Sequence, residues 1–490
     1  MKYLVPLWKH QLDAVEKSKI WPNMALLWDV GTGKTPAMIN IIRQKFNDNG
    51  RIMKTLIFAP PVVLQNWVRE FKAHSTIDPR FIYVSTGVGK TRGMNLRNKL
   101  YDSVMNNYSA QKIVLMNYEA IQNDIMRETL HLWQPEIMVC DEAHRCKNHE
   151  SIRAKAISNL AVVAKHRYLL TGTPILNSLV DIFQQFKILD QGDTFGKNFY
   201  AFRSLYFEDS NAAWAGRDGH FPKYIPRPTT YDEFQKKIYK KATRAIKSEC
   251  LDLPPFIRTT REVNLSTEQA KAYKEMEKEF ITYIQNEEKE KRAVMAQIAL
   301  TKSLRLLQII TGFANDDKGV AQRIFGGIPR LNALSEVLEE ITNQKSKVIV
   351  WATFKENYLQ IQEVCIKLGL KYVELHGGID LKQKQKNIDS FNNDASVSVM
   401  IANQSSGGIG VNLTSASYAV FYSRNFSLEQ DLQAEGRNYR GGSEIHKNIT
   451  RIDLVCPGTI DELVLECLAG KLNVSERVLS WAKGSKNGND

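Results

Sequence analysis

The sequence predicts an α/β protein with two tandem doubly wound parallel sheets and a mostly helical stretch between them. Two series of short apolar runs, separated by stretches of helical character, support this prediction. The runs lie at residues 55–59, 81–84, 112–116, 136–140 and 167–170, and again at 347–352, 371–375, 397–402, 418–422 and 450–455. Unbroken apolar runs of this length are typical of parallel strands that helices bury on both faces. Two such series indicate two lobes.

We expect the first lobe to be followed by a helical insertion and linker, a second lobe and a C-terminal helix with a frayed tail. The expected boundaries are residues 1–190, 191–328, 329–470 and 471–490. Within the insertion, Leu253–Pro255 predicts an extended crossing. Ser266 follows and can cap a helix that starts at Thr267 and runs to about Arg292.

Composition indicates a folded protein with a polyanionic partner. The chain has 490 residues, of which 43% are hydrophobic and 24% charged, and its formal net charge is +13. A positive excess favours binding to nucleic-acid phosphates, although it is also compatible with a merely basic protein. The six cysteines form no Cys-x-x-Cys pair, which favours free thiols over a zinc site. No signal-peptide core and no membrane-length apolar stretch is present, so we expect an intracellular protein.

The first chemical signal is a glycine-rich turn after the apolar run 24–28. Residues Asp29–Thr35 read Asp-Val-Gly-Thr-Gly-Lys-Thr, a pattern whose backbone amides can face phosphates. Lys34 would reach the β and γ phosphates and Thr35 would hold Mg²⁺. Trp28 stands where the strict pattern has glycine, and the alternative is a turn that merely starts a helix. The expected nucleotide-binding residues here are Gly31, Thr32, Gly33, Lys34 and Thr35.

The second signal is an acidic pair, Asp141 and Glu142, directly after the apolar run 136–140. An aspartate at the tip of a buried strand is where Mg²⁺ is held beside a phosphate loop. Glu142 can orient and deprotonate the attacking water. A helix N-cap is the alternative interpretation. The order and distance of this pair relative to Lys34 favour a nucleotide site.

The third signal lies near the C-terminus, in the stretch Gln433–Arg440. Arg437 and Arg440 are three residues apart, so we expect them to share one face of a helix. A cation supplied by a second lobe can neutralise the charge that develops on a γ-phosphate. The alternative is an arginine pair on the surface. On the first interpretation, the catalytic site is complete only when both lobes contribute.

Together these residues resemble the superfamily 2 helicases and translocases, and specifically the Swi/Snf-type branch. The resemblance runs from about Leu7 to Lys471. It is carried by segments similar to the family's opening motif and its motifs I, Ia, Ib, II, III, IV, V and VI, in that order. These segments are residues 7–11, 29–35, 59–71, 114–121, 141–148, 170–177, 347–354, 407–413 and 433–440.

The resemblance implies two RecA-like lobes, ATP and Mg²⁺ as cofactors, and a nucleic acid that lies across both lobes. It implies that Gln11 reads the adenine, that Gly410 and Gln433 also contact nucleotide, and that Asp141 and Thr35 hold the metal. It makes Lys34, Glu142, Arg437 and Arg440 the catalytic residues. It implies that Thr171 and Thr173 couple the two sites. The nucleic-acid contacts it implies are Pro60, Asn117, Thr353 and Ser405.

The resemblance leaves the mode of action open. We favour a monomeric translocase on duplex DNA, of the compact kind found in the cytoplasm of bacteria or phage-infected cells. A strand-separating or branch-migrating helicase is the alternative, and RNA remains open as a substrate. An ATP-timed nucleic-acid clamp is a further possibility. A scaffold without ATPase activity is disfavoured because Lys34, Asp141 and Glu142 are all present.

Trp67 is the one aromatic residue in these segments that invites a base-stacking role. It lies in the pattern Leu64-x-x-Trp67-x-x-x-Phe71. Residues at this spacing share one face of a helix. We therefore expect Trp67 to pack in the core.

Overall fold

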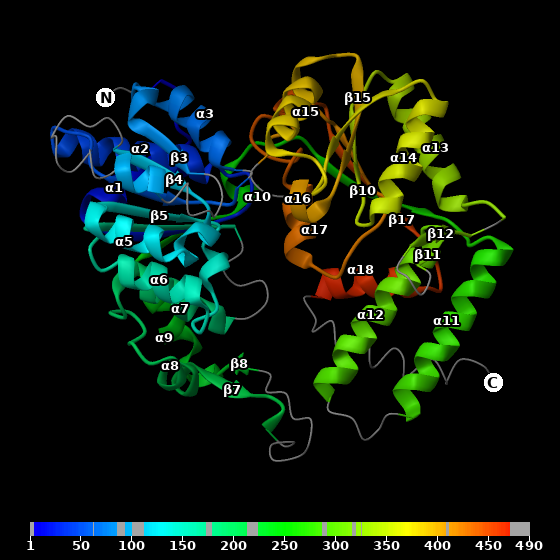
Figure 1. The fold of residues 1–490 in the computed structure, drawn as a ribbon, viewed down its shortest axis with the longest axis horizontal. Coiled ribbons are helices and arrows are strands. Elements are labelled where there is room, and N and C mark those ends of the chain that lie inside the picture. Colours follow the sequence, from blue (N-terminus) through cyan, green and yellow to red (C-terminus); the bar gives the residue numbers. More distant parts are fainter. Residues whose placement is uncertain are drawn as a thin grey trace. The chain divides into compact units, whose positions relative to one another are not determined.

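A computed structural model describes the chain except for residues 1–3, 62, 86–93, 100–111, 173–178, 213–223, 287–291, 316–319, 325, 408–410 and 471–490. The described residues form two compact units. Unit 1 contains the elements from α1 to α10, and unit 2 those from β10 to α18 (Figure 1). Each unit is built on its own parallel sheet with helices beside it, which confirms the predicted fold class.

The sheet of unit 1 has seven strands in the order β3-β4-β2-β5-β6-β1-β9, all of them parallel. Except for β9, each coincides with an apolar run expected from the sequence, because runs without polar residues suit strands covered on both faces. The strands are β1 (Asn23–Trp28), β2 (Thr55–Phe58), β3 (Ile82–Ser85), β4 (Ile113–Met116), β5 (Ile137–Asp141), β6 (His166–Thr171) and β9 (Ala242–Ala245).

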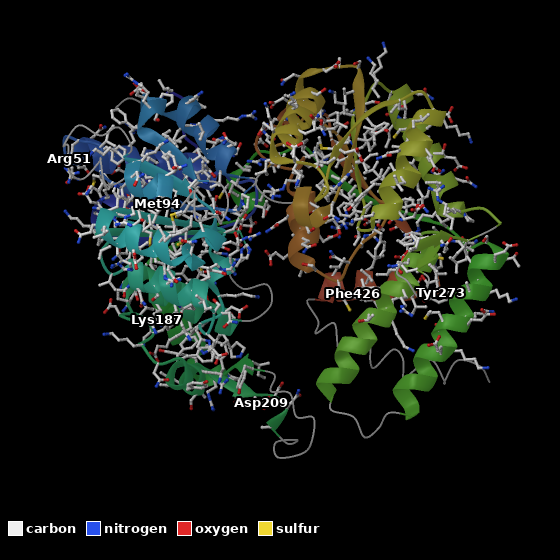
Figure 2. The ribbon with its side chains drawn as sticks, in the orientation of Figure 1. Arg51, Met94, Lys187, Asp209, Tyr273 and Phe426 are labelled. Carbon is white, nitrogen blue, oxygen red and sulfur yellow. The ribbon has the colours of Figure 1, made fainter. Side chains whose placement is uncertain are left out.

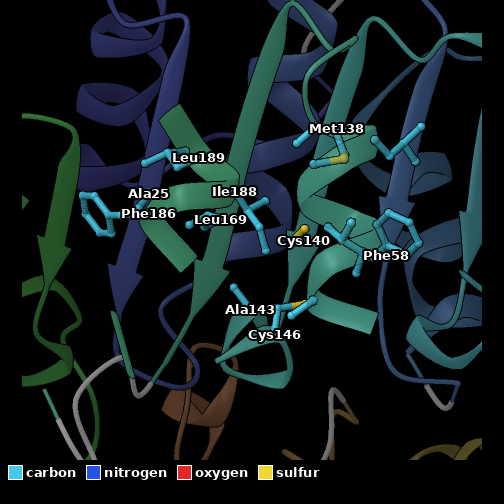
Figure 3. Close-up of a cluster of buried hydrophobic side chains, with 14 of the residues drawn as sticks. Ala25, Phe58, Met138, Cys140, Ala143, Cys146, Leu169, Phe186, Ile188 and Leu189 are labelled. Atoms are coloured by element: carbon cyan, nitrogen blue, oxygen red, sulfur yellow. The ribbon is translucent and has the colours of Figure 1, made fainter. Parts of the chain in front are cut away.

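Helices follow the strands of unit 1 as in a doubly wound fold. They are α1 (Lys9–Ile20), α2 (Lys34–Asp48), α3 (Leu64–His74), α5 (Asp124–Trp133), α6 (Ile152–Leu160), α7 (Ile182–Asp190), α8 (Phe199–Tyr206), α9 (Pro228–Tyr239) and α10 (Lys247–Cys250). Two short 3-10 helices, η2 (Tyr118–Gln122) and η3 (Ala143–Cys146), follow β4 and β5. Figure 3 shows part of the core, where Cys140 and Leu169 of the sheet pack with Ile188 of α7.

The sheet of unit 2 has six parallel strands in the order β10-β17-β16-β13-β15-β14. Again, all but one correspond to the predicted apolar runs. They are β10 (Phe256–Glu262), β13 (Val348–Trp351), β14 (Lys371–Leu375), β15 (Val397–Ala402), β16 (Tyr418–Phe421) and β17 (Ile449–Val455).

The helices of unit 2 lie beside this sheet and in a separate helical pair. They are α11 (Thr267–Asn286), α12 (Arg292–Ile310), α13 (Pro329–Asn343), α14 (Lys355–Lys367), α15 (Leu381–Asn393), α16 (Gln404–Gly407), α17 (Leu428–Glu435) and α18 (Ile460–Gly470). Tyr273 of α11, labelled in Figure 2, accepts a hydrogen bond from the backbone N–H of Ile460 at 2.8 Å. This contact ties α11 to the start of α18.

The stretch 191–328, expected as one mostly helical insertion, is divided between the two units. Its β9 joins the sheet of unit 1 and its β10 joins the sheet of unit 2. It also contains the hairpins β7–β8 (Phe207–Asp209 and Tyr224–Pro226) and β11–β12 (Phe313–Asn315 and Ala321–Arg323). The expected C-terminal helix and tail at 471–490 lie outside the described residues.

The helix expected after Ser266 begins where the sequence predicts. Ser266 Oγ accepts from the backbone N–H of Gln269 at 3.2 Å, and Gln269 Oε1 accepts from the backbone N–H of Ser266 at 3.2 Å. This reciprocal capping box satisfies two amides that a helix start leaves unpaired. The helix ends at Asn286 rather than near Arg292, and Arg292 instead begins α12.

Candidate functional site

The glycine-rich turn of unit 1 folds around the amino group of Lys34. It connects the end of β1 to the start of α2. Gly31 and Gly33 have φ angles of 87° and 75°, a left-handed conformation that glycine adopts without a Cβ clash. Lys34 Nζ donates to the carbonyls of Trp28 and Asp29, each at 3.0 Å. The turn thus holds a cation where a helix N-terminus begins, which is the arrangement of a phosphate loop.

Two further loop residues take the positions expected for a phosphate loop. Thr32 is buried, and its hydroxyl donates to the Asp29 carbonyl at 2.8 Å. Thr35 lies half-buried in the first turn of α2, next to Lys34. A hydrogen bond of its own threonine therefore closes the loop, and Thr35 lies at the start of the helix.

Helix α1 covers the other side of the turn. Gln11 Nε2 donates to the Gly33 carbonyl at 3.0 Å, and Gln11 Oε1 accepts from the backbone N–H of Trp8 at 2.8 Å. His10 Nε2 lies 2.8 Å from the carbonyl of Thr32. A Cβ at Gly33 would lie 2.2 Å from Gln11 Nε2, so glycine is required for this approach. The structure thus places Gln11 against the turn, while its role toward adenine remains a prediction.

Asp141 is the last residue of β5 and its carboxylate is buried. Its Oδ2 accepts from Trp67 Nε1 at 2.9 Å, and its Oδ1 accepts from the backbone N–H of Glu142 at 3.0 Å. Burial, together with the charge of the adjacent Glu142, raises the pKa of the Asp141 carboxyl to about 7, and Lys34 opposes this increase. The site therefore stabilises positive charge placed next to Asp141.

Glu142 follows with a left-handed backbone, φ 55°, which is uncommon for a residue other than glycine. Its carboxylate lies 3.4 Å from His144 Nδ1. Non-glycine residues in this conformation store strain and occur preferentially at functional sites. The chain therefore turns directly after Asp141, and the carboxylate of Glu142 lies beside His144.

The sheet brings the two sequence signals to one edge. β5 and β1 both flank β6, and all three strands are parallel, so their carboxyl ends meet. Gly172, just beyond β6, lies against the turn, because a Cβ there would be 3.4 Å from Lys34 Nζ. Thr171, at the end of β6, is fully buried. Thr173, the second predicted coupling residue, lies outside the described residues.

These residues fit a divalent cation bound with a nucleotide. A hydroxyl, a buried carboxylate and phosphate oxygens form the hard oxygen set that Mg²⁺ prefers. Burial is the main cause of the raised pKa of Asp141, and a cation bound beside this carboxyl would favour its charged form. The sequence predicts Thr35 and Asp141 as the protein's ligands in this set, and that assignment stays a prediction.

Trp67 is fully buried, which confirms its predicted place in the core. The sequence did not predict its hydrogen bond to Asp141. An indole N–H needs an acceptor when it is buried, so a tryptophan on the inner face of α3, next to a strand that ends in aspartate, was the available signal. Trp67 links α3 to the candidate metal ligand.

Trp28 departs from the strict glycine pattern without disturbing the turn. It is the last residue of β1, and its Nε1 donates to Thr243 Oγ1 of β9 at 2.9 Å. Asp29 Oδ2 accepts from the backbone N–H of Lys247 at 2.9 Å, and Asp29 N–H donates to the Ala245 carbonyl at 2.9 Å. The first residues of the loop are therefore bound to the segment that follows β9.

In unit 2, Arg437 and Arg440 do not share a helix face, so that expectation was wrong. Helix α17 ends at Glu435, and Arg437 and Arg440 lie in the turns that follow. Both guanidinium groups nevertheless meet at one place, because each donates from Nη1 to the Val411 carbonyl, at 3.4 Å and 3.3 Å. Motif V and the arginine segment are therefore in contact, and the Leu413 N–H also donates to the Arg437 carbonyl at 3.0 Å.

A buried ion-pair network holds α17, the helix that precedes these arginines. Arg451 of β17 donates to both carboxylate oxygens of Asp431, at 2.8 Å and 3.0 Å, and to Glu435 at 3.0 Å. Asp453 accepts from Arg451 at 2.9 Å and from Arg424 at 2.6 Å. The neighbouring arginine charges hold the pKa of the Asp453 carboxyl below its usual value despite its burial.

The two remaining nucleotide-contact predictions also fall in unit 2. Gln433 is buried on α17, where its Nε2 donates to Glu429 Oε1 at 3.3 Å. Gly410 lies outside the described residues. Neither position tests a contact with nucleotide, so both stay predictions.

The predicted nucleic-acid contacts of unit 1 lie beyond the carboxyl ends of neighbouring strands. Pro60 follows β2, and Asn117 follows β4, the strand that pairs with β2. Asn117 is buried, and its Nδ2 donates to Glu119 Oε2 at 3.1 Å. Its Oδ1 has no hydrogen-bond partner among the described residues. The edge therefore offers polar groups, and contact with nucleic acid remains a prediction.

The predicted contacts of unit 2, Thr353 and Ser405, line one pocket of about 810 Å³. Asn403 joins them, because its Nδ2 donates to the Thr353 carbonyl at 3.2 Å and its Oδ1 accepts from the Ser405 N–H at 2.9 Å. Tyr358 and His376 also line this pocket, with rings stacked at 4.4 Å between centroids. The structure thus brings together two residues that the sequence only placed in separate motifs.

Comparison with protein families finds two matches that together span most of the chain. Residues 13–311 match the SNF2-related domain. Residues 330–442 match the helicase conserved C-terminal domain. Among the described residues, no helix combines the length and apolar character that crossing a membrane would require.

Curated relatives are distant in sequence but cover nearly all of the chain. The CHD3-type chromatin-remodeling factor PICKLE of Arabidopsis thaliana is 24% identical over 93% of this chain and 32% of its own length. The nuclear protein STH1/NPS1 of Saccharomyces cerevisiae is 23% identical over 99% of this chain and 34% of its own length. The chain thus spans about a third of these relatives. A solved Sulfolobus solfataricus SWI2/SNF2 ATPase core in complex with dsDNA is 24% identical, with coverage of 99% of this chain and 96% of that one and a TM-score of 0.43.

Proposed function

Because the chain belongs to the SNF2-related domain family, we propose that it is an ATP-hydrolysing DNA translocase that acts on duplex DNA as a monomer. The observation that carries this proposal is the convergence, at one edge of the unit 1 sheet, of the Lys34 amino group with the buried carboxylate of Asp141. A phosphate-binding lysine beside a metal-binding aspartate is the arrangement that recurs in P-loop nucleoside triphosphatases.

In this site Lys34 binds the β and γ phosphates of ATP, and the amides of the turn cradle them. The chemistry that Mg²⁺ supplies when bound at Thr35 and Asp141 is neutralisation of phosphate charge. Glu142 accepts a proton from the attacking water, for which its position beside the strand end suits it. Gln11 orients the nucleotide through the turn that it contacts.

Arg437 and Arg440 neutralise the charge that builds on the γ-phosphate in the transition state. Their shared carbonyl at Val411 supports action as a pair, and the ion pairs of Arg451 support a fixed position for the helix before them. Residues that act only in the transition state affect turnover more than ATP affinity.

DNA is held through its phosphates at Pro60 and Asn117 of unit 1 and at Thr353 and Ser405 of unit 2. Backbone amides and small polar side chains suit contacts that do not read sequence. Thr171, buried at the end of β6 beside Gly172, couples the nucleotide to these contacts. We place the protein in the cytoplasm of a bacterial or phage-infected cell, which its six free thiols support.

The test measures ATP hydrolysis with duplex and with single-stranded DNA, together with two displacement assays. A translocase on duplex DNA should be stimulated more by duplex, should displace the third strand of a triplex, and should not separate a plain duplex. The Glu142→Gln variant is the matched control, because it should bind ATP and DNA but displace nothing. Separation of a plain duplex would assign a helicase, and ATP-dependent DNA binding without displacement would assign a clamp.

A further inference from the structure

A basic pocket in unit 1 shares no residue with the sites described above. Its volume is about 580 Å³, and six of its lining residues carry the argument. His149 follows η3, Lys155 lies on α6 and Lys187 on α7. Lys197 lies between α7 and α8, and Phe199 and Tyr200 begin α8. Lys187 is labelled in Figure 2.

The wall of the basic pocket is aromatic and fixed by packing. The rings of His149 and Phe199 stack at 3.8 Å between centroids with an interplanar angle of 21°. Phe183 of α7 meets Phe199 edge to face at 5.4 Å. Tyr200, next along the chain, leaves 60% of its surface exposed. The pocket thus presents a preformed apolar wall and one accessible ring.

The three lysines of the basic pocket have no carboxylate partner among the described residues. No carboxylate of the described residues lies within 4.0 Å of the amino groups of Lys155, Lys187 or Lys197. By contrast, Lys147 pairs with Asp181 at 3.1 Å, and Lys241 pairs with Asp190 at 3.0 Å. Lys187 Nζ donates instead to the carbonyl of Lys197 at 3.3 Å, which keeps two of the pocket lysines adjacent.

The groups around His149 also indicate an excess of positive charge in the basic pocket. Burial lowers the pKa of His149, and the nearby charges of Lys155, Lys187 and Arg203 lower it further, against the opposing charge of Glu150. Glu150 is largely exposed, with its Oε1 3.9 Å from His149 Nε2. A concave site with several cations and one exposed acid concentrates anions.

We propose that the basic pocket is a second nucleic-acid site, in which Lys155, Lys187 and Lys197 hold backbone phosphates. This inference rests on the proposed function, because it adds a contact to a DNA-binding motor. Lysine binds phosphate as a point charge and releases condensed counter-ions when it does so. The exposed ring of Tyr200 offers a stacking face for an unpaired base.

The local hydrogen bonds favour a backbone phosphate over a free nucleotide. The first amides of α8 would suit a terminal phosphate, but Asn198 already occupies them. Its Oδ1 accepts from the N–H groups of Tyr200 and Ala201, at 2.9 Å and 3.1 Å. The ligand is therefore left with side-chain donors, foremost the three lysines, and such contacts are the usual way a protein holds a phosphodiester chain without reading sequence.

The experiment compares two triple variants of the full chain that remove the same number of charges. The pocket variant carries Lys155→Ala, Lys187→Ala and Lys197→Ala. The matched control carries substitutions at three exposed lysines outside the pocket, namely Lys165→Ala, Lys236→Ala and Lys240→Ala. Affinity for duplex and for single-stranded DNA is measured by fluorescence anisotropy at several salt concentrations, and thermal unfolding verifies that each variant is folded.

Loss of three phosphate contacts should make DNA affinity less dependent on salt in the pocket variant, and the control variant should not show this change. Between 50 and 200 mM salt, wild-type affinity for duplex should fall up to about 40-fold more than that of the pocket variant. The control should keep the wild-type slope. A Tyr200→Ala substitution should further weaken single-stranded binding about 10-fold, and Tyr200→Phe should restore it.

The outcomes separate this inference from the function on which it rests. If wild-type protein binds DNA but both triple variants have equal slopes, the basic pocket is not a nucleic-acid site. If the pocket variant loses only a weak second site for ATP or pyrophosphate, the phosphate comes from small molecules and the nucleic-acid assignment fails. If wild-type protein neither binds DNA nor responds to it in ATP hydrolysis, the proposed function itself fails.

Discussion

The two units position their candidate site residues by different kinds of interaction. In unit 1, Lys34 is held by backbone carbonyls, and Asp141 is held by an indole N–H and a backbone amide. In unit 2, the helix that leads to Arg437 and Arg440 is held by buried ion pairs centred on Arg451. The unit 1 site is thus built by strand ends and loop backbone. The unit 2 site depends instead on balanced buried charges.

This difference has consequences for how each unit tolerates change. A site built by the backbone keeps its shape when one functional side chain is removed. Such a substitution can therefore reduce activity without reducing the stability of the fold. A buried ion network leaves uncompensated charge when one member is lost, which is costly in a low-dielectric interior. We therefore expect substitutions in unit 1 to affect catalysis first and those in the unit 2 network to affect folding first.

The largest expected effect is that of Lys34→Ala in unit 1. Loss of the phosphate-binding cation should reduce kcat/KM for ATP about 1,000-fold or more, because a charge that supports the transition state is removed. The thermal unfolding curve should stay within error of wild type. Phosphate release and differential scanning calorimetry measure both quantities. Turnover near the wild-type rate would refute the phosphate-loop assignment.

Arg451→Leu should affect stability instead. It leaves the buried Asp431 without its partner and Asp453 with Arg424 alone, and losses of about 3–5 kcal/mol are usual when a buried pair is broken. Calorimetry should show a destabilised unit 2 transition with unit 1 unchanged. Arg323→Leu is the control, because Arg323 pairs with Glu356 and Glu363 on the surface and should cost less than about 1 kcal/mol. Equal losses in the two variants would contradict the comparison.

Arg440→Ala should reduce turnover with little effect on ATP affinity. Arg440 is half-buried and lies outside the network that holds α17, so the fold should persist. We expect kcat to fall about 100-fold while the Kd for ATP changes less than about threefold. Steady-state kinetics and binding of a fluorescent ATP analogue measure the two quantities. Loss of affinity with normal kcat would exclude a transition-state role.

Trp67→Phe should raise the Mg²⁺ concentration required for nucleotide binding and hydrolysis about 10-fold. The substitution removes the N–H donor to Asp141 but keeps an aromatic ring in the core. Trp133→Phe is the matched control, since Trp133 is equally buried and its Nε1 has no partner among the described residues. Both variants should lose similar stability. If both variants required the same Mg²⁺ concentration, the role of Trp67 would be limited to packing in the core.

The smallest expected effect is the acid sensitivity of unit 1 at His166. Burial, with Lys45 nearby, lowers the pKa of His166 from 6.5 to about 4. The unfolded chain takes up a proton below about pH 6.5 and the folded chain does not, so stability is lost as the pH falls from 6.5 toward 4. Between pH 8 and pH 6 the loss should be about 1 kcal/mol. His166→Gln should remove this part of the pH dependence, measured by urea unfolding.

Most strands could be predicted because their apolar runs reflect burial on both faces. Two strands at sheet edges, β9 and β10, could not be predicted, since neither contains such a run. β10 reads Phe-Ile-Arg-Thr-Thr-Arg-Glu and is largely exposed. Its arginines pair with acids of other elements, with Arg258 2.6 Å from Glu435 and Arg261 3.0 Å from Glu336. Such long-range pairs carry no local periodicity.

The candidate site was predictable where its residues sit in short contiguous motifs. Spacing alone identified Lys34 and Asp141, and the sheet places both at one edge. The helix face expected for Arg437 and Arg440 failed because α17 ends at Glu435. That end depends on contacts such as the Leu413 N–H with the Arg437 carbonyl, which join segments that are distant in sequence.

The bonds between the phosphate loop and the segment after β9 make that loop a point of mechanical attachment. Asp29 binds the backbone of Ala245 and Lys247, and Trp28 binds Thr243, shortly before the chain leaves unit 1 at Asp252. Tension drawn along the chain from unit 2 would therefore reach the start of the glycine-rich turn early. A tether anchored in this way would let pulling on the polypeptide change the shape of the turn around Lys34 without any new contact.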